Sequence, residues 1–398
     1  MKQCWRWFGP ADTVALADLH QVGVEGIVTA LHHLSPGQVW STDEIRKRMD
    51  LLSTQGYEWS VVESLPVSED IKQMGSGAKT HLAAYRESLE NLAHCGVETV
   101  CYNFMPILDW TRTELRAPQD HGGTAMIFRL LDFIVFDLFI LQREGAQESY
   151  TEVQIDAARS RFEQMEDENK RRLQNNIVAG LPGANDNWTV DDVNALLNQY
   201  KDMQPEQLRQ NLIDFLSEVA PTAEALGIRL CCHPDDPPFG LLGLPRIMSS
   251  TDDYDKVLSA VDTPANGATL CTGSLGVAAD FDPQDFVARL GPRIHFVHLR
   301  NTKRLPSMDT VRPDFFEAAH LEGDTDMVAT IKALMGEESR RRAEGRADWQ
   351  IPMRPDHGQE LLSDLTSDSM PGYPLIGRMR GLAELRGIMA ACASGSAV

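Results

Sequence analysis

The sequence lacks the long uninterrupted apolar run that a membrane-spanning helix requires. Its most hydrophobic stretch, IFRLLDFIVFDLFIL at 127–141, is interrupted by Arg129, Asp132 and Asp137, and it is shorter than the roughly 20 residues that cross a bilayer. The opening MKQCWRWFGP contains no apolar core of the length found in a secretory signal peptide. We therefore expect a cytoplasmic protein in which residues 127–141 are buried inside the fold.

Cysteine and basic residues are also scarce. The seven cysteines, an odd number that includes the adjacent pair Cys231 and Cys232, do not resemble the framework of a disulfide-rich secreted domain. Only 37 Lys and Arg oppose 58 Asp and Glu, which gives a formal net charge of −21. Because this charge repels phosphate backbones and anionic lipid surfaces, we expect neither nucleic acid nor a membrane as a partner.

What the chain does contain is a regular alternation of short apolar segments with helical patterns. The 398 residues are 42% hydrophobic and 24% charged, which is typical of a globular enzyme. Helical patterns separate the apolar segments, and the one at 41–56 opens with a Ser41 and Glu44 capping pair. Eight strand–helix units in order predict an α/β protein with a closed (β/α)8 TIM barrel. The predicted strands are 4–9, 26–33, 57–64, 99–106, 228–234, 268–274, 294–300 and 350–356.

A long insertion accounts for the length of the chain. Such a barrel typically needs about 250 residues, and the surplus lies at 107–203, between the fourth predicted strand and its helix. It includes the charged amphipathic segment 157–176 and the loop GLPGAND at 180–186. We expect one catalytic domain over 1–398, with this helical insertion on the catalytic face as a lid or a subunit contact. A merely decorative helical hairpin is the alternative.

Metal-ligand side chains stand at the ends of four consecutive predicted strands. The fifth strand ends in His233, the sixth carries Cys271, the seventh carries His298 and the eighth ends in Asp356. Each of these residues alone is more often structural, but the C-terminal ends of barrel strands converge, and catalytic residues come from them. Two imidazoles, a thiolate and a carboxylate form a ligand set for a divalent first-row metal. We predict a catalytic metal site, and the ligand types by themselves are compatible with Zn²⁺ or Co²⁺.

Strand alternation separates these residues from their neighbours. Cys231 and His233 share one face of their strand, whereas Cys232 points to the other face, towards the layer between sheet and helices. His295 lies further from the C-terminal end of its strand than His298 does. We therefore predict structural roles for Cys232 and His295.

Groups suited to proton transfer and anion binding follow the last strands. His357 is adjacent to a predicted ligand and Tyr373 lies on the same loop, and both can transfer protons when their pKa values are tuned. Arg300 and Asn301 directly follow His298, and a guanidinium beside an amide can hold an anionic or polyhydroxylated ligand.

Aromatic residues beside hydrogen-bond donors suggest a sugar-like ligand. Arg6 lies among aromatic residues in WRWFGP, and Trp110 follows the fourth strand in LDWTRT. We predict that both contact substrate, although Trp is also a common core residue. Glu63, His32 and His33 at the ends of the third and second strands are weaker candidates.

With these residues in place, the sequence resembles the mannonate dehydratases, metal-dependent lyases of hexuronate catabolism within the xylose isomerase-like barrels. The resemblance extends over essentially the whole chain. The motifs on which the resemblance rests are WRWFGP, GIVTALHH, CYNFMPILDWTRT, LCCHPDDPP, LCTGSLG, FVHLRN and MRPDHG. By these motifs the family's metal ligands correspond to the four residues selected above, and its proton-transfer residues correspond to His357 and Tyr373.

The resemblance implies that D-mannonate is dehydrated to 2-keto-3-deoxy-D-gluconate, with Mn²⁺ or Fe²⁺ as the metal. We also expect a homo-oligomer, either a dimer or a tetramer. A base must take the C2 proton and an acid must protonate the C3 hydroxyl as it leaves. We provisionally assign the Tyr373 phenolate as the base, its pKa lowered by the metal and Arg300, and His357 as the acid. The reverse assignment remains open.

Three other functions use similar parts. A metal beside a proton-transfer pair also suits a sugar or sugar-acid isomerase or epimerase, which would conserve the mass of its substrate. A phosphodiesterase on this barrel would need a basic face and a carboxylate-rich site, which this acidic sequence does not offer. A non-catalytic sugar-acid sensor would need a DNA-binding or effector segment, and the sequence shows no pattern of that kind.

Overall fold

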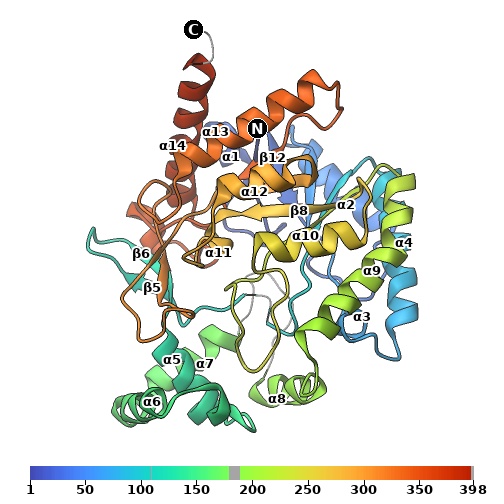
Figure 1. Cartoon of the computed structure of the whole chain (residues 1–398). Helices are drawn as coiled ribbons and strands as arrows, with labels where there is room; N and C mark the ends of the chain where they lie inside the picture. The colour runs from blue at the N-terminus through green and yellow to red at the C-terminus, as the bar shows by residue number, and fades with distance from the viewer. Residues whose placement is uncertain (109, 179–188, 396–398) are drawn as a thin grey trace.

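The core of the fold is a closed barrel of eight parallel strands (Figure 1). The computed structural model describes residues 1–108, 110–178 and 189–395. The predicted TIM barrel is confirmed, and all eight predicted strand segments contribute to it in sequence order. The strands are β1 (Lys2–Arg6), β2 (Gly26–Thr29), β3 (Trp59–Glu63), β4 (Thr99–Tyr102), β7 (Arg229–Cys232), β8 (Asn266–Cys271), β9 (Ile294–His298) and β12 (Pro352–Arg354).

Apolar packing on both faces of the strands holds the barrel. The interior is filled by a compact set of mostly small side chains, as expected for a barrel that is a packed core and not a pore: Cys4, Val28, Val61, Cys101, Cys231 and Phe296. A much larger cluster, which includes Cys232, fills the layer between strands and helices. The predicted orientation of Cys232 is therefore confirmed.

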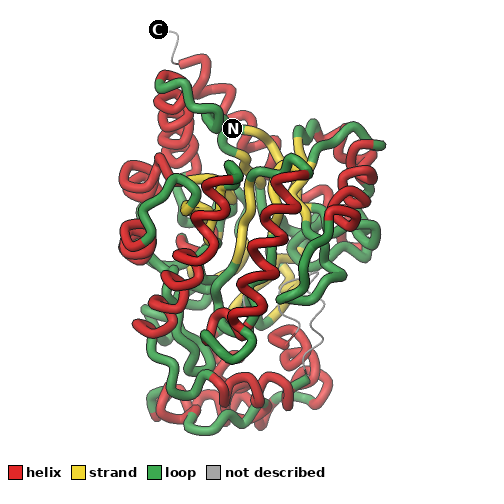
Figure 2. Tube along the Cα trace, turned by 90° about the vertical axis from the view of Figure 1, so that its right-hand side faces the viewer, coloured by secondary structure: helices red, strands yellow, loops and turns green. Residues whose placement is uncertain are grey.

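Helices follow the strands and cover the outside of the barrel (Figures 1 and 2). The predicted cap of α2 is present, because the Ser41 hydroxyl accepts a hydrogen bond from the Glu44 backbone N–H at 3.3 Å. The helices are α1 (Leu16–Val22), α2 (Thr42–Ser53), α3 (Glu69–Gln73), α4 (Ala78–His94), α9 (Pro205–Ala225), α10 (Thr251–Ala260), α11 (Thr272–Leu275), α12 (Pro283–Leu290), α13 (Met327–Ala343) and α14 (Leu375–Gly395).

The insertion after β4 is helical as predicted, but it also contains a β-hairpin that the sequence did not indicate. The hairpin strands β5 and β6 join β10 and β11 in an antiparallel sheet ordered β10-β11-β6-β5. Phe128 of β6 pairs with Phe315 of β11, so the insertion is tied to the loop after β9. The predicted loop at 180–186 lies outside the described residues. The elements are β5 (Glu114–Pro118), β6 (Thr124–Phe128), β10 (Thr302–Arg304), β11 (Phe315–Glu317), α5 (Leu130–Val135), the π-helix Phe136–Ile140, the 3-10 helix Ala146–Ser149, α6 (Glu152–Gln164), α7 (Asp167–Val178) and α8 (Val190–Gln199).

The insertion packs onto the barrel through a second hydrophobic cluster. Phe133 contacts both Phe128 and Phe136 there, and the loop after β7 contributes Phe239 and Leu241. Much of 127–141 is buried, as predicted. Figures 1 and 2 place these helices at one end of the barrel, opposite to both termini. No helix in the described ranges is long and apolar enough to cross a membrane.

Candidate active site

The predicted metal ligands meet where the barrel strands end. Cys271 is the last residue of β8 and His298 the last of β9, and the strand register pairs them directly. His233 follows β7 by one residue. Arg354, at the end of β12, pairs with His298, so Asp356 emerges beside the same group. The closed parallel barrel thus brings together four residues that span more than 120 positions of the sequence.

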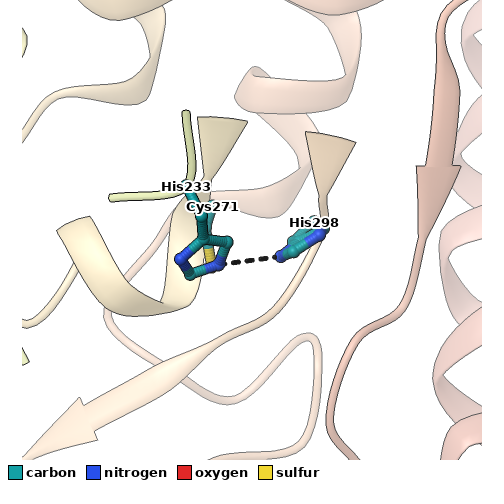
Figure 3. Close-up of side chains that lie close together, drawn as sticks. All are labelled: His233, Cys271 and His298. Atoms are coloured by element: carbon teal, nitrogen blue, oxygen red, sulfur yellow. Dashed lines mark hydrogen bonds between the residues drawn. The ribbon is translucent and has the colours of Figure 1, made fainter. Parts of the chain in front are cut away.

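Three of these side chains form a compact cluster that could hold a metal ion (Figure 3). The candidate ligand atoms of His233, Cys271 and His298 all lie within 4.8 Å of one another, and Nε2 of His233 is 3.2 Å from Nδ1 of His298. Asp356 stands at the edge of the cluster. Its Oδ2 is 3.7 Å from Nδ1 of His298 and 3.9 Å from Sγ of Cys271.

The electrostatics of the cluster favour a metal-binding thiolate. Burial opposes ionisation of Cys271, but hydrogen bonding to His233 and His298 and their charge lower the pKa of the thiol well below its usual value. Burial likewise opposes the charged form of His233, but Cys271 raises the pKa of that imidazole to about 10. The cluster therefore favours the thiolate form of Cys271 beside a protonated His233. A divalent metal would replace that proton, because thiolate and neutral imidazole are its preferred ligands.

Supporting contacts orient both imidazoles. Nδ1–H of His233 donates to the carbonyl oxygen of Pro234 at 2.7 Å, which leaves Nε2 facing the cluster. On the other ring, Nε2 of His298 lies 3.3 Å from a carboxylate oxygen of Glu63, so Nδ1 faces the cluster. Metal-binding histidines are commonly oriented in this way by a carbonyl or carboxylate on the far nitrogen. The residues present therefore fit a metal site.

A first buried ion-pair group surrounds Asp356. Nη2 of Arg354 contacts Glu63 at 2.8 Å, and its Nη1 pairs with Asp356. Arg6 reaches Glu63 at 3.1 Å. Burial raises the pKa of Asp356, but neighbouring charges, above all that of Arg354, lower it. The resulting pKa of Asp356 is well below its usual value. Sequence reasoning rated Glu63 a weak candidate and missed Arg354, although its position two residues before Asp356 was a usable signal.

A second buried group of ion pairs contains Arg300. Its Nε and Nη2 each lie 2.7 Å from Glu317, and its Nη1 lies 2.6 Å from Asp236. Arg112 bonds to the same two carboxylates. Arg300 lines the cavity as predicted, but its guanidinium is already bound by two carboxylates. Asp236, Glu317 and Arg112 were all missed, since they come from loops whose partners no local pattern specifies.

Asn301, predicted to bind substrate, is not brought into the site. Its amide nitrogen donates to the carbonyl oxygens of His320 and Thr325 at 2.9 and 3.0 Å, and its Oδ1 accepts from the Thr325 N–H at 3.0 Å. All three hydrogen bonds join the Asn301 side chain to backbone groups of His320 and Thr325, further along the loop after β9. The physical reason is that a buried amide side chain satisfies its polar atoms with the nearest backbone groups.

His357 and Tyr373 lie next to each other beside the cluster. Nε2 of His357 is 3.1 Å from the Tyr373 hydroxyl, and the two side chains are buried. Burial, with Asp356 as the next contribution, raises the pKa of Tyr373 to about 12. We expected the metal and Arg300 to lower this pKa; the protein groups around Tyr373 by themselves raise it.

The predicted substrate residues Arg6 and Trp110 line the same cavity as His233, His357 and Tyr373. Both are buried, and in the described part of the chain Nε of Arg6 and Nε1 of Trp110 have no hydrogen-bond partner. Buried donors without acceptors are costly. These two atoms are therefore available to a ligand that enters the cavity.

A larger cavity, about 690 Å³, lies at the opposite end of the barrel, among residues such as Lys2, Thr99 and Arg229 at the strand starts. His295 lies there, and its Nε2–H donates to the carbonyl oxygen of Pro264 at 3.0 Å. This agrees with the structural role predicted for His295. We place the candidate active site at the other end, because the candidate metal ligands and the His357–Tyr373 pair are there.

Comparison with known proteins identifies relatives over almost the whole chain. The model of the family D-mannonate dehydratase (UxuA) matches residues 1–397. The chain is 55% identical over 388 residues to Mannonate dehydratase 1 of Agrobacterium fabrum, covering 98% of this chain and 96% of that protein. It is 52% identical over 390 residues to Mannonate dehydratase of Rhizobium meliloti, again covering 98% and 96%.

Solved structures show the same relationship. The crystal structure of mannonate dehydratase from Streptococcus suis serotype 2 superposes with a TM-score of 0.77 at 30% identity, covering 100% of this chain and 94% of that one. A D-tagatose 3-epimerase-like protein superposes with a TM-score of 0.52 at 12% identity, covering 100% of both chains. The second likeness shows the barrel fold alone.

Proposed function

The chain belongs to the D-mannonate dehydratase family, and on that premise we propose how its residues remove water from D-mannonate to give 2-keto-3-deoxy-D-gluconate. The enzyme is a hydro-lyase. The observation that carries the residue assignments is the meeting of a His/Cys/His cluster and a His–Tyr pair at the end of one barrel. An isomerase on this barrel would need none of the acid chemistry that expels a hydroxyl.

We assign the metal to His233, Cys271, His298 and Asp356. The first three form the compact cluster, and Asp356 is within 3.9 Å of two of them. The mixed sulfur, nitrogen and oxygen set suits several first-row cations, and Mn²⁺ or Fe²⁺ is the choice that the family resemblance implies. Such a cation would supply Lewis-acid stabilisation of the negative charge that develops on the substrate carboxylate, a contribution of several kcal/mol.

His357 and Tyr373 divide the proton transfers. Because burial keeps the pKa of Tyr373 high, at about 12, the phenol retains its proton near neutral pH and serves as the acid. His357 then takes the C2 proton on Nε2, and Tyr373 gives its proton to the C3 hydroxyl, which leaves as water. This assignment reverses the provisional one.

The same pair can restore itself after turnover. The proton that His357 receives from C2 sits on Nε2, 3.1 Å from the Tyr373 oxygen that has lost one. Transfer across this contact returns both groups to their starting states. The enol product then tautomerises to the 2-keto-3-deoxy acid, so atoms and protons balance without an external acid or base.

Arg6 and Trp110 hold the substrate. Their unsatisfied N–H groups, within the described residues, line the cavity, and the carboxylate and hydroxyl oxygens of a sugar acid are matching acceptors. Arg300 acts differently: it anchors Glu317 and Asp236, and its Nη1 also lies 3.7 Å from Oδ2 of Asp356.

The insertion is part of the catalytic unit. Its first segment supplies Trp110 and Arg112, and its hairpin shares a sheet with β11, which carries Glu317. We therefore propose a single catalytic domain over 1–398, in which the described parts of the insertion at 107–203 form one wall of the site and act as a lid. The expected homo-oligomer stays a prediction, which light scattering of the purified enzyme tests.

The decisive experiment combines metal analysis with a mass-resolved product assay. The purified enzyme should contain about one divalent metal per chain, and D-mannonate should yield a product lighter by one water. Chelation should abolish turnover, and Mn²⁺ or Fe²⁺ should restore it. A product of unchanged mass would indicate an isomerase, and full activity in metal-free enzyme would refute the metal assignment.

A further inference from the structure

Glu317 stands out among the buried charges because it belongs to an accessory element yet lies against the proton-transfer pair. It ends β11, in the antiparallel sheet outside the barrel, and its side chain is 2% exposed. Arg112 and Arg300 bind both of its carboxylate oxygens at 2.7 Å. The Gln359 amide donates to its backbone carbonyl at 3.0 Å. The carboxylate is thus held rigidly from several sides.

The remaining neighbour of this carboxylate is His357. Nδ1 of His357 lies 3.5 Å from Oε1 of Glu317, and it is buried with no hydrogen-bond partner in the described residues. The opposite nitrogen, Nε2, faces the Tyr373 hydroxyl at 3.1 Å. Glu317, His357 and Tyr373 therefore lie in a row. Among the described side chains, Nδ1 faces Glu317 alone, whereas Nε2 faces the Tyr373 hydroxyl and lies 3.6 Å from Oδ1 of Asp356, the residue assigned to the metal.

We propose that Glu317 is a positioning residue for the dehydration: its carboxylate accepts Nδ1–H of His357 and thereby presents the Nε2 lone pair to the C2 proton. A neutral imidazole carries a single ring proton, and a carboxylate at one nitrogen fixes which nitrogen carries it. It also stabilises the imidazolium that forms when Nε2 accepts a proton. At 3.5 Å the contact is loose, and such bonds shorten when substrate binds.

The antiparallel sheet β10-β11-β6-β5 positions the Glu317 carboxylate. Glu317 pairs with Thr302 in the register of β11 and β10, and β11 pairs in turn with β6 of the insertion. The loop after β9 and the insertion after β4 therefore cooperate to place one oxygen behind His357. This inference rests on the role of His357 proposed above and adds a residue that the motifs did not indicate.

Asp236 provides a matched control. It is as buried as Glu317 and bonds to the same two arginines, with Arg112 at 3.0 Å and Arg300 at 2.6 Å. It forms no hydrogen bond or ion pair with His357 in the described structure. Glu317→Gln and Asp236→Asn therefore remove the same charge from the same cations, but only the first removes the partner of His357.

The experiment compares the two variants in metal-loaded enzyme with D-mannonate. Glu317→Gln should lower kcat by at least about 10-fold, since removing the carboxylate behind a catalytic imidazole costs up to about 10⁴-fold, while KM changes by less than about twofold. Asp236→Asn should lower the melting temperature similarly but reduce kcat much less. Equal losses of kcat in the two variants would overturn the proposal.

A double-mutant cycle with His357→Asn separates positioning from general damage. If Glu317 acts through His357, adding Glu317→Gln to His357→Asn should cost less than about threefold in kcat. Multiplication of the two single losses would overturn the positioning role. Wild-type turnover by His357→Asn alone would instead refute the function proposed for His357, so the two failures are distinguishable.

Glu317→Asp covers the case in which the amide variant does not fold. It keeps a negative charge opposite the two arginines and withdraws the oxygen from His357 by one methylene group. We expect a folded enzyme whose kcat is at least about fivefold lower. Wild-type kcat in Glu317→Asp would overturn the inference.

Discussion

Replacing Tyr373 by Phe isolates the proposed acid, because it removes a single oxygen atom. The ring keeps its packing against Phe8, whose centroid is 4.8 Å away and nearly perpendicular, and loses the 3.1 Å contact with His357. One buried hydrogen bond contributes about 1 kcal/mol to stability, so the variant should fold. General acid catalysis contributes about 10²- to 10⁴-fold. The expected loss of at least about 100-fold in kcat corresponds to about 2.7 kcal/mol in activation free energy.

The assay measures kcat and KM for D-mannonate, with metal content determined on the same samples. KM should change by less than about twofold, because the hydroxyl acts on the leaving group more than on ground-state binding. Tyr57→Phe is the matched control: this hydroxyl is buried at the opposite end of the barrel and has no hydrogen-bond partner among the described residues. The acid role would be refuted if Tyr373→Phe kept the wild-type kcat. It would also be refuted if the decrease in kcat matched a decrease in bound metal.

Three further outcomes are expected. Cys271→Ser should lose metal and activity, whereas Cys101→Ser, whose hydroxyl would retain a partner in Thr269, should bind metal normally; equal metal content in both would contradict the ligand assignment. Asn301→Ala removes three buried backbone bonds and should lower stability by about 2 to 3 kcal/mol in denaturant titration, with kcat changed less than about twofold; a rise in KM without unfolding would restore it as a substrate contact. Burial, reinforced by the charges of two arginines, lowers the pKa of His295 from 6.5 to about 3. The unfolded chain therefore binds the proton first, and this stability is complete above pH 6.5 and is lost as the pH falls towards 3. His295→Gln should flatten the melting temperature against pH in this window, and parallel curves for the two proteins would refute it.

The candidate metal ligands illustrate what can be read without coordinates. His233, Cys271 and His298 stand at the ends of strands whose apolar pattern was clear, and in a closed parallel barrel all strand ends meet at one mouth. Strand alternation also placed Cys232 on the helix side. These inferences depend only on local periodicity and on one rule of topology, so they needed no knowledge of the neighbours of each residue.

Arg300 and Glu317 illustrate the opposite case. Sequence position put Arg300 near the site, but it could not say that two carboxylates from other loops already bind its guanidinium. Glu317 lies well beyond the end of β9, on a strand whose existence depends on pairing with the hairpin of the insertion. No local pattern specifies such a pairing, because it depends on how two long loops pack against each other.

By itself, the sequence determined the barrel, the order of its strands and the convergence of the candidate metal ligands at their ends, because these follow from periodicity repeated along the chain. Only the tertiary structure decided which charges neutralise one another, and that Tyr373 is buried so that its pKa rises to about 12. The reason is physical: ion pairing and desolvation depend on distances between side chains from distant segments, and those distances exist only once the chain has folded.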